Sequence, residues 1–230
     1  MPPVRVRRHT RRRRPSTESV VFRLSPVDKH AIVSSWGTVG GKPAHVKGGF
    51  YGLGETEAAL RRGAPAYSAM ESAVSTLDDL LDFGVVPPTA LRLDPEEKVV
   101  SVQEQIPNAV TWGRLSDLER AQVNRMDLMK IAVIDIIVHQ ADRHGGNLLV
   151  TPDNHAHAID NEFAFGMFRA SVAIRAVQGE KIPKTILRKL KELQKEDFVS
   201  AFAGATTMEK IEKAWERKLE LERTGGRIPE

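Results

Sequence analysis

The chain has 230 residues, of which 41% are apolar and 28% charged, a composition typical of globular proteins. It has no cysteine, which excludes disulfides, thiolate nucleophiles and cysteine-ligated zinc. The best candidate for a membrane span, residues 131–138, is too short for that role and contains Asp135. Because no apolar signal-peptide core opens the chain either, we expect a cytoplasmic protein without a membrane span.

The positive charge of the chain is concentrated at its start. Seven arginines and no acid give residues 1–14 a charge of +7, which leaves −3 for the rest out of a net +4. Such a segment is expected to be disordered by itself and to bind polyanions with strong salt dependence. We predict a disordered Arg-rich arm over residues 1–18. It either contacts nucleic acid through residues 1–14 or serves as a solubilising tail.

Strand-like runs dominate the next part of the chain. Turns rich in glycine and proline separate five such runs, which predict strands over 20–24, 31–39, 44–47, 89–93 and 99–103. Apolar residues at helical spacing predict one helix over 66–81, and residues 50–65 are expected to form a loop. We therefore predict that residues 19–107 form a small antiparallel β lobe with a single helix.

The second half of the chain is mainly helical. Amphipathic or apolar periodicity predicts helices over 117–124, 126–140, 184–195 and 208–222. The second of these is apolar nearly all round, which indicates a buried helix. A turn at Pro152-Asp153-Asn154 joins two short predicted strands, over 148–150 and 157–159, into a hairpin. We predict an α+β fold in which residues 108–230 form a larger helical lobe that contains this hairpin.

The loop between the buried helix and the hairpin carries a dense set of polar residues, Asp142-Arg143-His144-Gly145-Gly146-Asn147, and Ile159-Asp160 ends the hairpin. Metal-assisted phosphoryl transfer needs a divalent cation on the phosphates and a carboxylate that orients the attacking hydroxyl. Mg²⁺ prefers oxygen ligands, so Asn147 and Asp160 are candidate metal ligands and Asp142 is the candidate catalytic carboxylate.

Two further residues of this loop are candidates for catalysis. Arg143 and His144 are suited to stabilising the charge of the loop or of a phosphate, and His144 to sharing proton transfer with Asp142. The alternative is that Asp142 and Asn147 simply cap a turn, as these residue types commonly do.

The order Asp-Arg-His-x-x-Asn, a hairpin and then Ile-Asp resembles the motif of atypical kinases related to the phosphatidylinositol 3/4-kinases, and also that of HipA-type bacterial kinases. The phrase Ala158 to Gly166 and the segment Met70 to Thr89 are similar to small bacterial and phage proteins of the phosphatidylinositol-kinase-like group. The resemblance covers roughly residues 44–166. It implies a two-lobed protein-kinase-like fold, with ATP and Mg²⁺ as cofactors.

The resemblance also implies a strand lysine that holds nucleotide phosphates and pairs with a helix glutamate. Lys47 and Glu71 match these two positions, and Lys42 is the second choice because it lies in a predicted turn. The strand that ends at Glu104 leads into Gln105-Ile106-Pro107, where the family holds adenine through backbone groups of the hinge between the lobes. Glu104 and Ile106 are therefore candidate nucleotide-binding residues.

The sequence departs from the family pattern at three places. Asn161-Glu162 follows the predicted metal-binding acid, where small or aromatic residues are more usual, and this alters the expected geometry of a second metal position. The segment after Gly166 passes quickly into helix, so we expect no long activation loop. Gly48-Gly49 follow the predicted lysine, whereas a phosphate-binding glycine loop would precede it.

Two functions are consistent with these residues. The first is an ATP- and Mg²⁺-dependent kinase that transfers the γ-phosphate to a hydroxyl, with a protein serine or threonine preferred over a lipid. Ser16 and Thr17 beside the arm are then convenient acceptors for autophosphorylation. The second is a weakly active pseudokinase or nucleotide-binding module, which its Arg-rich arm tethers to nucleic acid or to an assembly.

Overall fold

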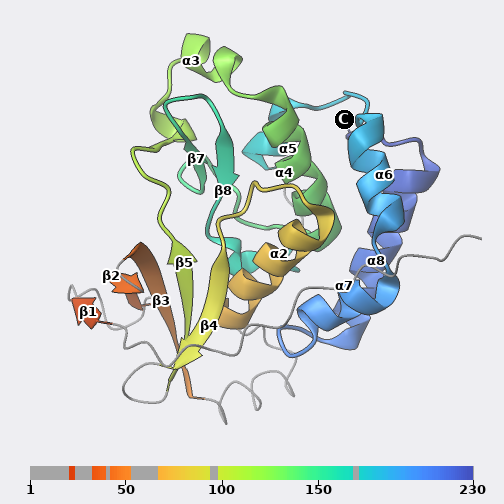
Figure 1. Cartoon of the computed structure of the whole chain (residues 1–230). Coiled ribbons are helices and arrows are strands. Elements are labelled where there is room, and N and C mark those ends of the chain that lie inside the picture. Colours follow the sequence, from red (N-terminus) through yellow and green to blue (C-terminus); the bar gives the residue numbers. More distant parts are fainter. Residues whose placement is uncertain are drawn as a thin grey trace, which may run out of the picture.

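The computed structural model describes residues 21–23, 33–39, 42–52, 67–93, 98–167 and 171–229, which Figure 1 draws as coloured ribbons. The predicted arm over 1–18, with Ser16 and Thr17, lies outside the described residues, as does most of the predicted 50–65 loop. Of the helices in the described ranges, none combines the length and the apolar content that a membrane crossing requires.

A five-stranded antiparallel sheet forms the base of the first lobe, in the order β1-β2-β3-β5-β4. Its strands are β1 (Val21–Arg23), β2 (Val33–Val39), β3 (Lys42–Gly52), β4 (Thr89–Leu93) and β5 (Lys98–Glu104). Each of the five predicted strands is present, and the predicted antiparallel pairing of the last two is confirmed.

Strand β3 is longer than predicted. Lys42 is its first residue and lies opposite Val39, so the prediction that Lys42 sits in a turn is wrong. The strand also continues through Gly52, which removes residues 50–52 from the predicted loop. Strand β3 pairs with β2 on one side and with β5 on the other, so ladder hydrogen bonds form on both of its edges. This pairing outweighs the local turn signal of Gly48 and Gly49.

Helix α2 (Tyr67–Leu81) lies between the sheet and the two C-terminal helices α7 (Lys195–Phe202) and α8 (Met208–Arg223), as Figure 1 shows. Its apolar stripe of Met70, Val74, Leu77 and Leu81 is fully buried and belongs to the main core, which continues into the second lobe. Burying each such side chain contributes roughly 2 kcal/mol. Helix α2 is therefore fastened to the second lobe, although the chain places it within the first.

Asp78 fixes the chain where α2 ends. Its carboxylate accepts hydrogen bonds from the backbone N–H groups of Gly84 at 3.0 Å and Val85 at 3.1 Å. Gly84 has a φ of +69°, a conformation that glycine adopts without steric cost. Burial raises the pKa of Asp78 from 3.8 to about 6, against the lowering effect of the backbone hydrogen bonds. The folded protein therefore binds a proton on Asp78 more tightly than the unfolded chain does.

We expect the free energy of unfolding of the wild type to fall relative to that of Asp78→Asn as the pH rises from about 4 to about 6. In this window the folded state holds more protons than the unfolded state, so rising pH lowers stability. Asparagine does not titrate and lacks this contribution. Urea unfolding of both proteins between about pH 4 and about pH 7 measures the difference, and a constant difference would contradict this account.

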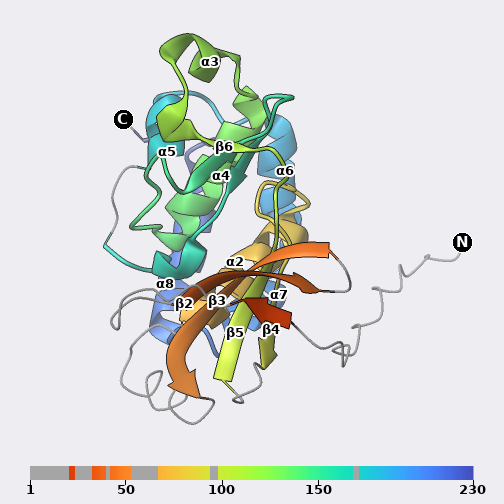
Figure 2. The same ribbon diagram turned by 90° about the vertical axis from the view of Figure 1, so that its left-hand side faces the viewer.

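The second lobe combines helices with a small sheet. The helices are α3 (Asp117–Gln122), α4 (Arg125–Val138), α5 (Val172–Ala176), α6 (Lys184–Glu192), α7 and α8, with the 3₁₀ turns η1 (Trp112–Arg114) and η2 (Asn161–Phe163). The antiparallel sheet is formed by β6 (Val110–Thr111), β7 (Leu148–Val150) and β8 (Ala156–Ala158). Figure 2 shows α4 and this sheet stacked above the five-stranded sheet. The predicted α+β, two-lobed architecture is confirmed.

Three details of the second lobe differ from the sequence prediction. The helix predicted over 184–195 ends at Glu192, because Leu193 takes an extended conformation (φ −66°, ψ 121°) and is buried, and the helix α7 that begins at Lys195 was not predicted. Strand β6 and helix α5 were not predicted, since two and five residues are too short to show a period. The hairpin strand predicted over 157–159 begins and ends one residue earlier.

Helix α4 is the centre of the second lobe and sets the start of the polar loop. Eleven of its 14 residues are buried, so neighbours surround it on all sides, as its sequence predicts. It begins with Asn124, whose side chain caps the N-terminus, and ends at Val138 because His139 adopts a left-handed conformation (φ 47°). The chain then leaves the core and enters the loop that starts at Asp142.

Candidate active site

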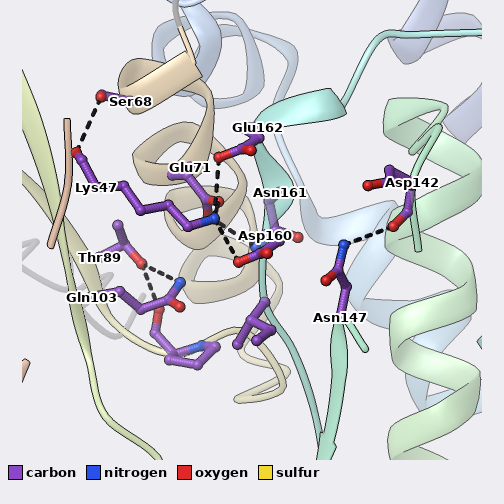
Figure 3. Close-up of polar contacts among 12 residues, drawn as sticks. Lys47, Ser68, Glu71, Thr89, Gln103, Asp142, Asn147, Asp160, Asn161 and Glu162 are labelled. Atoms are coloured by element: carbon purple, nitrogen blue, oxygen red, sulfur yellow. Dashed lines mark hydrogen bonds and ion pairs between the residues drawn. The ribbon is translucent and has the colours of Figure 1, made fainter. Parts of the chain in front are cut away.

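A lysine of the first lobe and an acid of the second lobe are in contact at the boundary between the lobes. Lys47 Nζ lies 2.5 Å from Asp160 Oδ1, although 113 positions separate the two residues in the sequence. The same ammonium group lies 3.2 Å from Glu71 Oε1 on α2 and 3.1 Å from Glu162 Oε2 in η2. Figure 3 shows the three carboxylates converging on it. The predicted pair of Lys47 and Glu71 is therefore present, with two further acids.

Strand alternation points Lys47 into this site. Its neighbours Ala44 and Val46 face the other side of the sheet, where they pack with Val100 and Val102 of β5 in a small separate core. The hydroxyl of Ser68 on α2 donates a hydrogen bond to the carbonyl of Lys47 at 3.5 Å. The strand therefore presents the lysine toward α2 and the second lobe.

The charges around Lys47 do not balance. Burial alone would lower the pKa of Lys47, but the carboxylates of Glu71, Asp160 and Glu162 outweigh it and raise the pKa, so the side chain stays an ammonium. Burial raises the pKa of Glu162, and its neighbouring carboxylates add to this effect. Three acids face one cation, and the site therefore attracts further positive charge.

The backbone of Asp160 is held in a conformation that is uncommon for a residue with a side chain. Its φ of 58° and ψ of 57° lie in the left-handed region, which costs on the order of 1 kcal/mol. The buried amide of Gln140 supports it by donating from Nε2 to the carbonyl of Asp160 at 3.2 Å. Its other end, Oε1, accepts from the N–H of Asp142 at 3.2 Å. Gln140 thus ties the start of the loop to Asp160, a role that sequence reasoning missed.

Asn147 closes the loop and presents an oxygen to the site. Its amide nitrogen donates to the carbonyl of Asp142 at 2.9 Å, which identifies the other amide atom as the oxygen. Figure 3 shows this oxygen on the side that faces Asp160. The two predicted metal ligands therefore present oxygens toward a common space.

Asp142 and His144 form the open front of the loop. The Asp142 side chain is 47% exposed, and His144 Nε2 lies 3.9 Å from its Oδ2, beyond hydrogen-bonding distance. His144 Nδ1 accepts a hydrogen bond from the N–H of Gly146 at 2.9 Å, so a proton on the neutral ring resides on Nε2. Both side chains are accessible from the front of the loop, as the predicted catalytic roles require.

Gly145 allows the loop to pack against η1. Its carbonyl accepts a hydrogen bond from the N–H of Gly113 at 3.0 Å. A Cβ on Gly145 would lie 3.1 Å from the Gly113 backbone, closer than side chains normally approach. The need for a small residue here therefore arises from close packing of two backbone segments.

Arg143, a candidate for stabilising the charge of the loop or of a phosphate, is buried beneath the loop. Its side chain is 1% exposed, and it donates to the carbonyls of Asn147 and Ile159, to Asp135 and to Asn161. A guanidinium whose Nη atoms donate to buried protein groups is not presented to a phosphate. The structure instead makes Arg143 a support beneath the loop. The signal that could have revealed this was Asp135, an acid within the apolar second half of α4.

Asn161 links this support to the lysine cluster. It is fully buried, its Oδ1 accepts from Arg143 Nη2 at 2.5 Å, and its Nδ2 donates to Glu71 Oε2 at 3.4 Å. A continuous polar chain therefore runs from Asp135 through Arg143 and Asn161 to Glu71. The sequence showed Asn161 as a departure from the family pattern, and the structure gives it a place in the architecture of the site.

The segment predicted to hold adenine begins where β5 ends. The N–H of Glu104 donates to the carbonyl of Pro88 at 2.9 Å, and that of Gln105 donates to the carbonyl of Pro43 at 3.4 Å. Proline has no N–H, so Pro88 cannot return a hydrogen bond to the Glu104 carbonyl. The N–H group of Glu104 is thus used by the sheet hydrogen bonds. Its carbonyl and the backbone of Ile106 are the candidate groups for a nucleotide base.

The fold and the comparisons with known proteins agree. The structure is similar to the crystal structure of a Helicobacter pylori proinflammatory kinase, CtkA, with a TM-score of 0.50 and 10% sequence identity over 84% of this chain and 90% of that chain. This likeness defines the class, a kinase-like fold. The family model of phosphatidylinositol 3- and 4-kinases matches residues 79–199, just over half of the chain, and the chain belongs to this family. No curated protein matches the sequence.

The family match includes only part of the site. It spans the loop from Asp142 to Asn147 and the acid Asp160, whereas Lys47 and Glu71 precede it. Lys47 and Glu71 are therefore assigned to the site by their position in the structure.

The structure predicts that Arg143→Met lowers the free energy of unfolding by about 3 kcal/mol or more, because it leaves Asp135 buried without its cation. The double variant Asp135→Asn/Arg143→Met should lose less than the sum of the two single changes, since it removes the uncompensated charge. Urea unfolding measures these values, with Arg188→Met on the exposed face of α6 as the control. An Arg143→Met protein as stable as this control would contradict the support role.

Proposed function

We propose that this protein is an ATP- and Mg²⁺-dependent phosphotransferase that moves the γ-phosphate of ATP to a hydroxyl group. The observation that carries the proposal is the contact of Lys47 with Asp160 across the lobe boundary, beside the loop that bears Asp142 and Asn147. Phosphoryl transfer depends on a cation for the phosphates, oxygen ligands for a metal and a carboxylate for the nucleophile. This arrangement offers all three from different elements of the fold.

The residues fit a magnesium ion. Mg²⁺ usually takes one or two carboxylates from a protein and completes its shell with water and phosphate oxygens. The Asn147 oxygen and the Asp160 carboxylate, one oxygen of which is on Lys47, would hold it. When bound, the metal would neutralise the charge of the phosphates. The excess negative charge around Lys47 favours a divalent cation at this position.

Asp142 would accept or orient the proton of the attacking hydroxyl. Its carboxylate is exposed at the front of the loop, while its backbone is fixed by hydrogen bonds to Gln140 and Asn147. His144 is placed to assist this proton transfer after a small side-chain movement. Lys47 would bind phosphate oxygens, and the carbonyl of Glu104 with the backbone of Ile106 would hold the adenine.

The acceptor that we propose is a protein serine or threonine. The family takes its name from lipid substrates, but the sequence contains no segment that resembles a lipid-surface module. Ser16 and Thr17, beside the Arg-rich arm, are convenient sites for autophosphorylation. Incubation with γ-labelled ATP and Mg²⁺, with the protein alone and with phosphatidylinositol vesicles, distinguishes the two acceptors. Label on the vesicles and not on protein would reject the serine/threonine preference.

We expect Asp142→Asn to lower the rate of label transfer about 100-fold or more while nucleotide binding persists, because it removes the group that handles the hydroxyl proton. Asp160→Asn should abolish transfer and weaken Mg²⁺-dependent nucleotide binding. Asp197→Asn, on the exposed side of α7, is the matched control and should behave as wild type. Nucleotide binding by the wild type without transfer or ATP hydrolysis would reject the enzyme and favour a nucleotide-binding module.

A further inference from the structure

All three N–H donors of the Lys47 ammonium group are used by carboxylates. An ammonium group has three N–H donors. In the structure, Nζ lies 3.2 Å from Glu71, 2.5 Å from Asp160 and 3.1 Å from Glu162, so each donor has one partner. A phosphate oxygen can therefore bind Lys47 only where one of these carboxylates gives way.

The three carboxylates differ in how firmly they are held. Glu71 projects from α2, a helix fastened to the main core, and its second oxygen accepts a hydrogen bond from Asn161. Asp160 is 32% exposed at the front and is the proposed metal ligand. Glu162 lies on the one-turn helix η2, and among the described residues its carboxylate has Lys47 as its hydrogen-bond partner. Among the described residues the Asp160 carboxylate also has Lys47 as its hydrogen-bond partner, but a metal ion would hold it, so Glu162 is the carboxylate left to give way.

Glu162 also places a negative charge where phosphates would arrive. With a metal ion on Asp160, Lys47 would keep Glu71 as its anchor and could offer its remaining donors to a phosphate. Glu162 competes for those donors and repels the incoming charge. Its position two residues after Asp160 puts it at the same edge of the site as the metal ligand.

We propose that Glu162 sets the nucleotide affinity of this protein by competing with the nucleotide phosphates for Lys47, and that it withdraws from Lys47 when a nucleotide binds. The inference rests on the proposed function, since it takes Lys47 as the phosphate-binding residue. It assigns a role to a residue that departs from the family pattern. Glu162 would change the binding free energy that the phosphates contribute, and it would leave the contribution of the adenine base unchanged.

The test is nucleotide binding by wild type and Glu162→Gln, measured by isothermal titration calorimetry with Mg²⁺ and ATP, ADP or adenosine. Glutamine keeps the shape and an acceptor oxygen but loses the charge, so we expect about tenfold tighter binding of ATP and ADP. Adenosine has no phosphate, and its affinity should not change. Unchanged or weaker ATP binding by Glu162→Gln would overturn the proposal, as would an equal gain for adenosine.

Two matched variants sharpen the experiment. Glu71→Gln should weaken ATP binding, because its single amide oxygen cannot accept from both Lys47 and Asn161 and it carries no charge to anchor the ammonium group. Glu196→Gln, exposed in the first turn of α7, should leave ATP binding unchanged. Thermal unfolding confirms that each variant is folded. If Glu162→Gln does not fold, Glu162→Asp, whose shorter side chain reaches Lys47 less well, should shift ATP affinity in the same direction.

The two proposals fail in different ways. If neither wild type nor Glu162→Gln binds ATP, the proposed function is rejected and this inference with it. If wild type binds ATP and transfers phosphate, but Glu162→Gln binds ATP no more tightly, this inference alone is rejected.

Discussion

The charge cluster around Lys47 joins the two lobes of this protein and defines the site between them. Among the residues of the five-stranded sheet whose burial is described, four aliphatic side chains of β3 and β5 form a small separate core, whereas α2 and the second lobe share the main core. Lys47 reaches from that sheet to Glu71 on α2 and to Asp160 beyond β8. The position of β3 against the second lobe therefore depends on a buried electrostatic contact as well as on apolar packing. A site held in this way responds to any ligand that changes its charge.

Behind the exposed residues lies a layer of buried polar side chains. Gln140 connects the loop to Asp160, and Arg143 with Asn161 connects the loop to Glu71. These contacts position the backbone of the loop while Asp142 at its front remains open. A rigid support beneath an accessible front is what precise positioning of reacting groups requires. The loop over residues 142–147, which lies in the range matched by the family model, is therefore also the loop that these buried contacts position.

The sequence predicted the parts of this site that depend on local spacing and chain order. The loop, the hairpin acid and the buried helix α4 were found in this way, whereas the resemblance to the kinase family implied Lys47 and Glu71. The direction in which Arg143 turns was missed, because it depends on Asp135 and Asn161, eight and 18 positions away. The turn expected at Lys42 was wrong because Lys42 already pairs with Val39 of β2 and so begins β3. Contacts between residues, which local propensity does not include, decided both cases.

The most direct test of the central claim is a crystal structure with Mg²⁺ and a non-hydrolysable ATP analogue. The account predicts a phosphate oxygen within hydrogen-bonding distance of Lys47 Nζ, and a metal ion bound by Asp160 and the Asn147 oxygen. The base should lie against the Glu104–Ile106 backbone. A nucleotide bound elsewhere, with Lys47 still held by Glu71, Asp160 and Glu162, would contradict it.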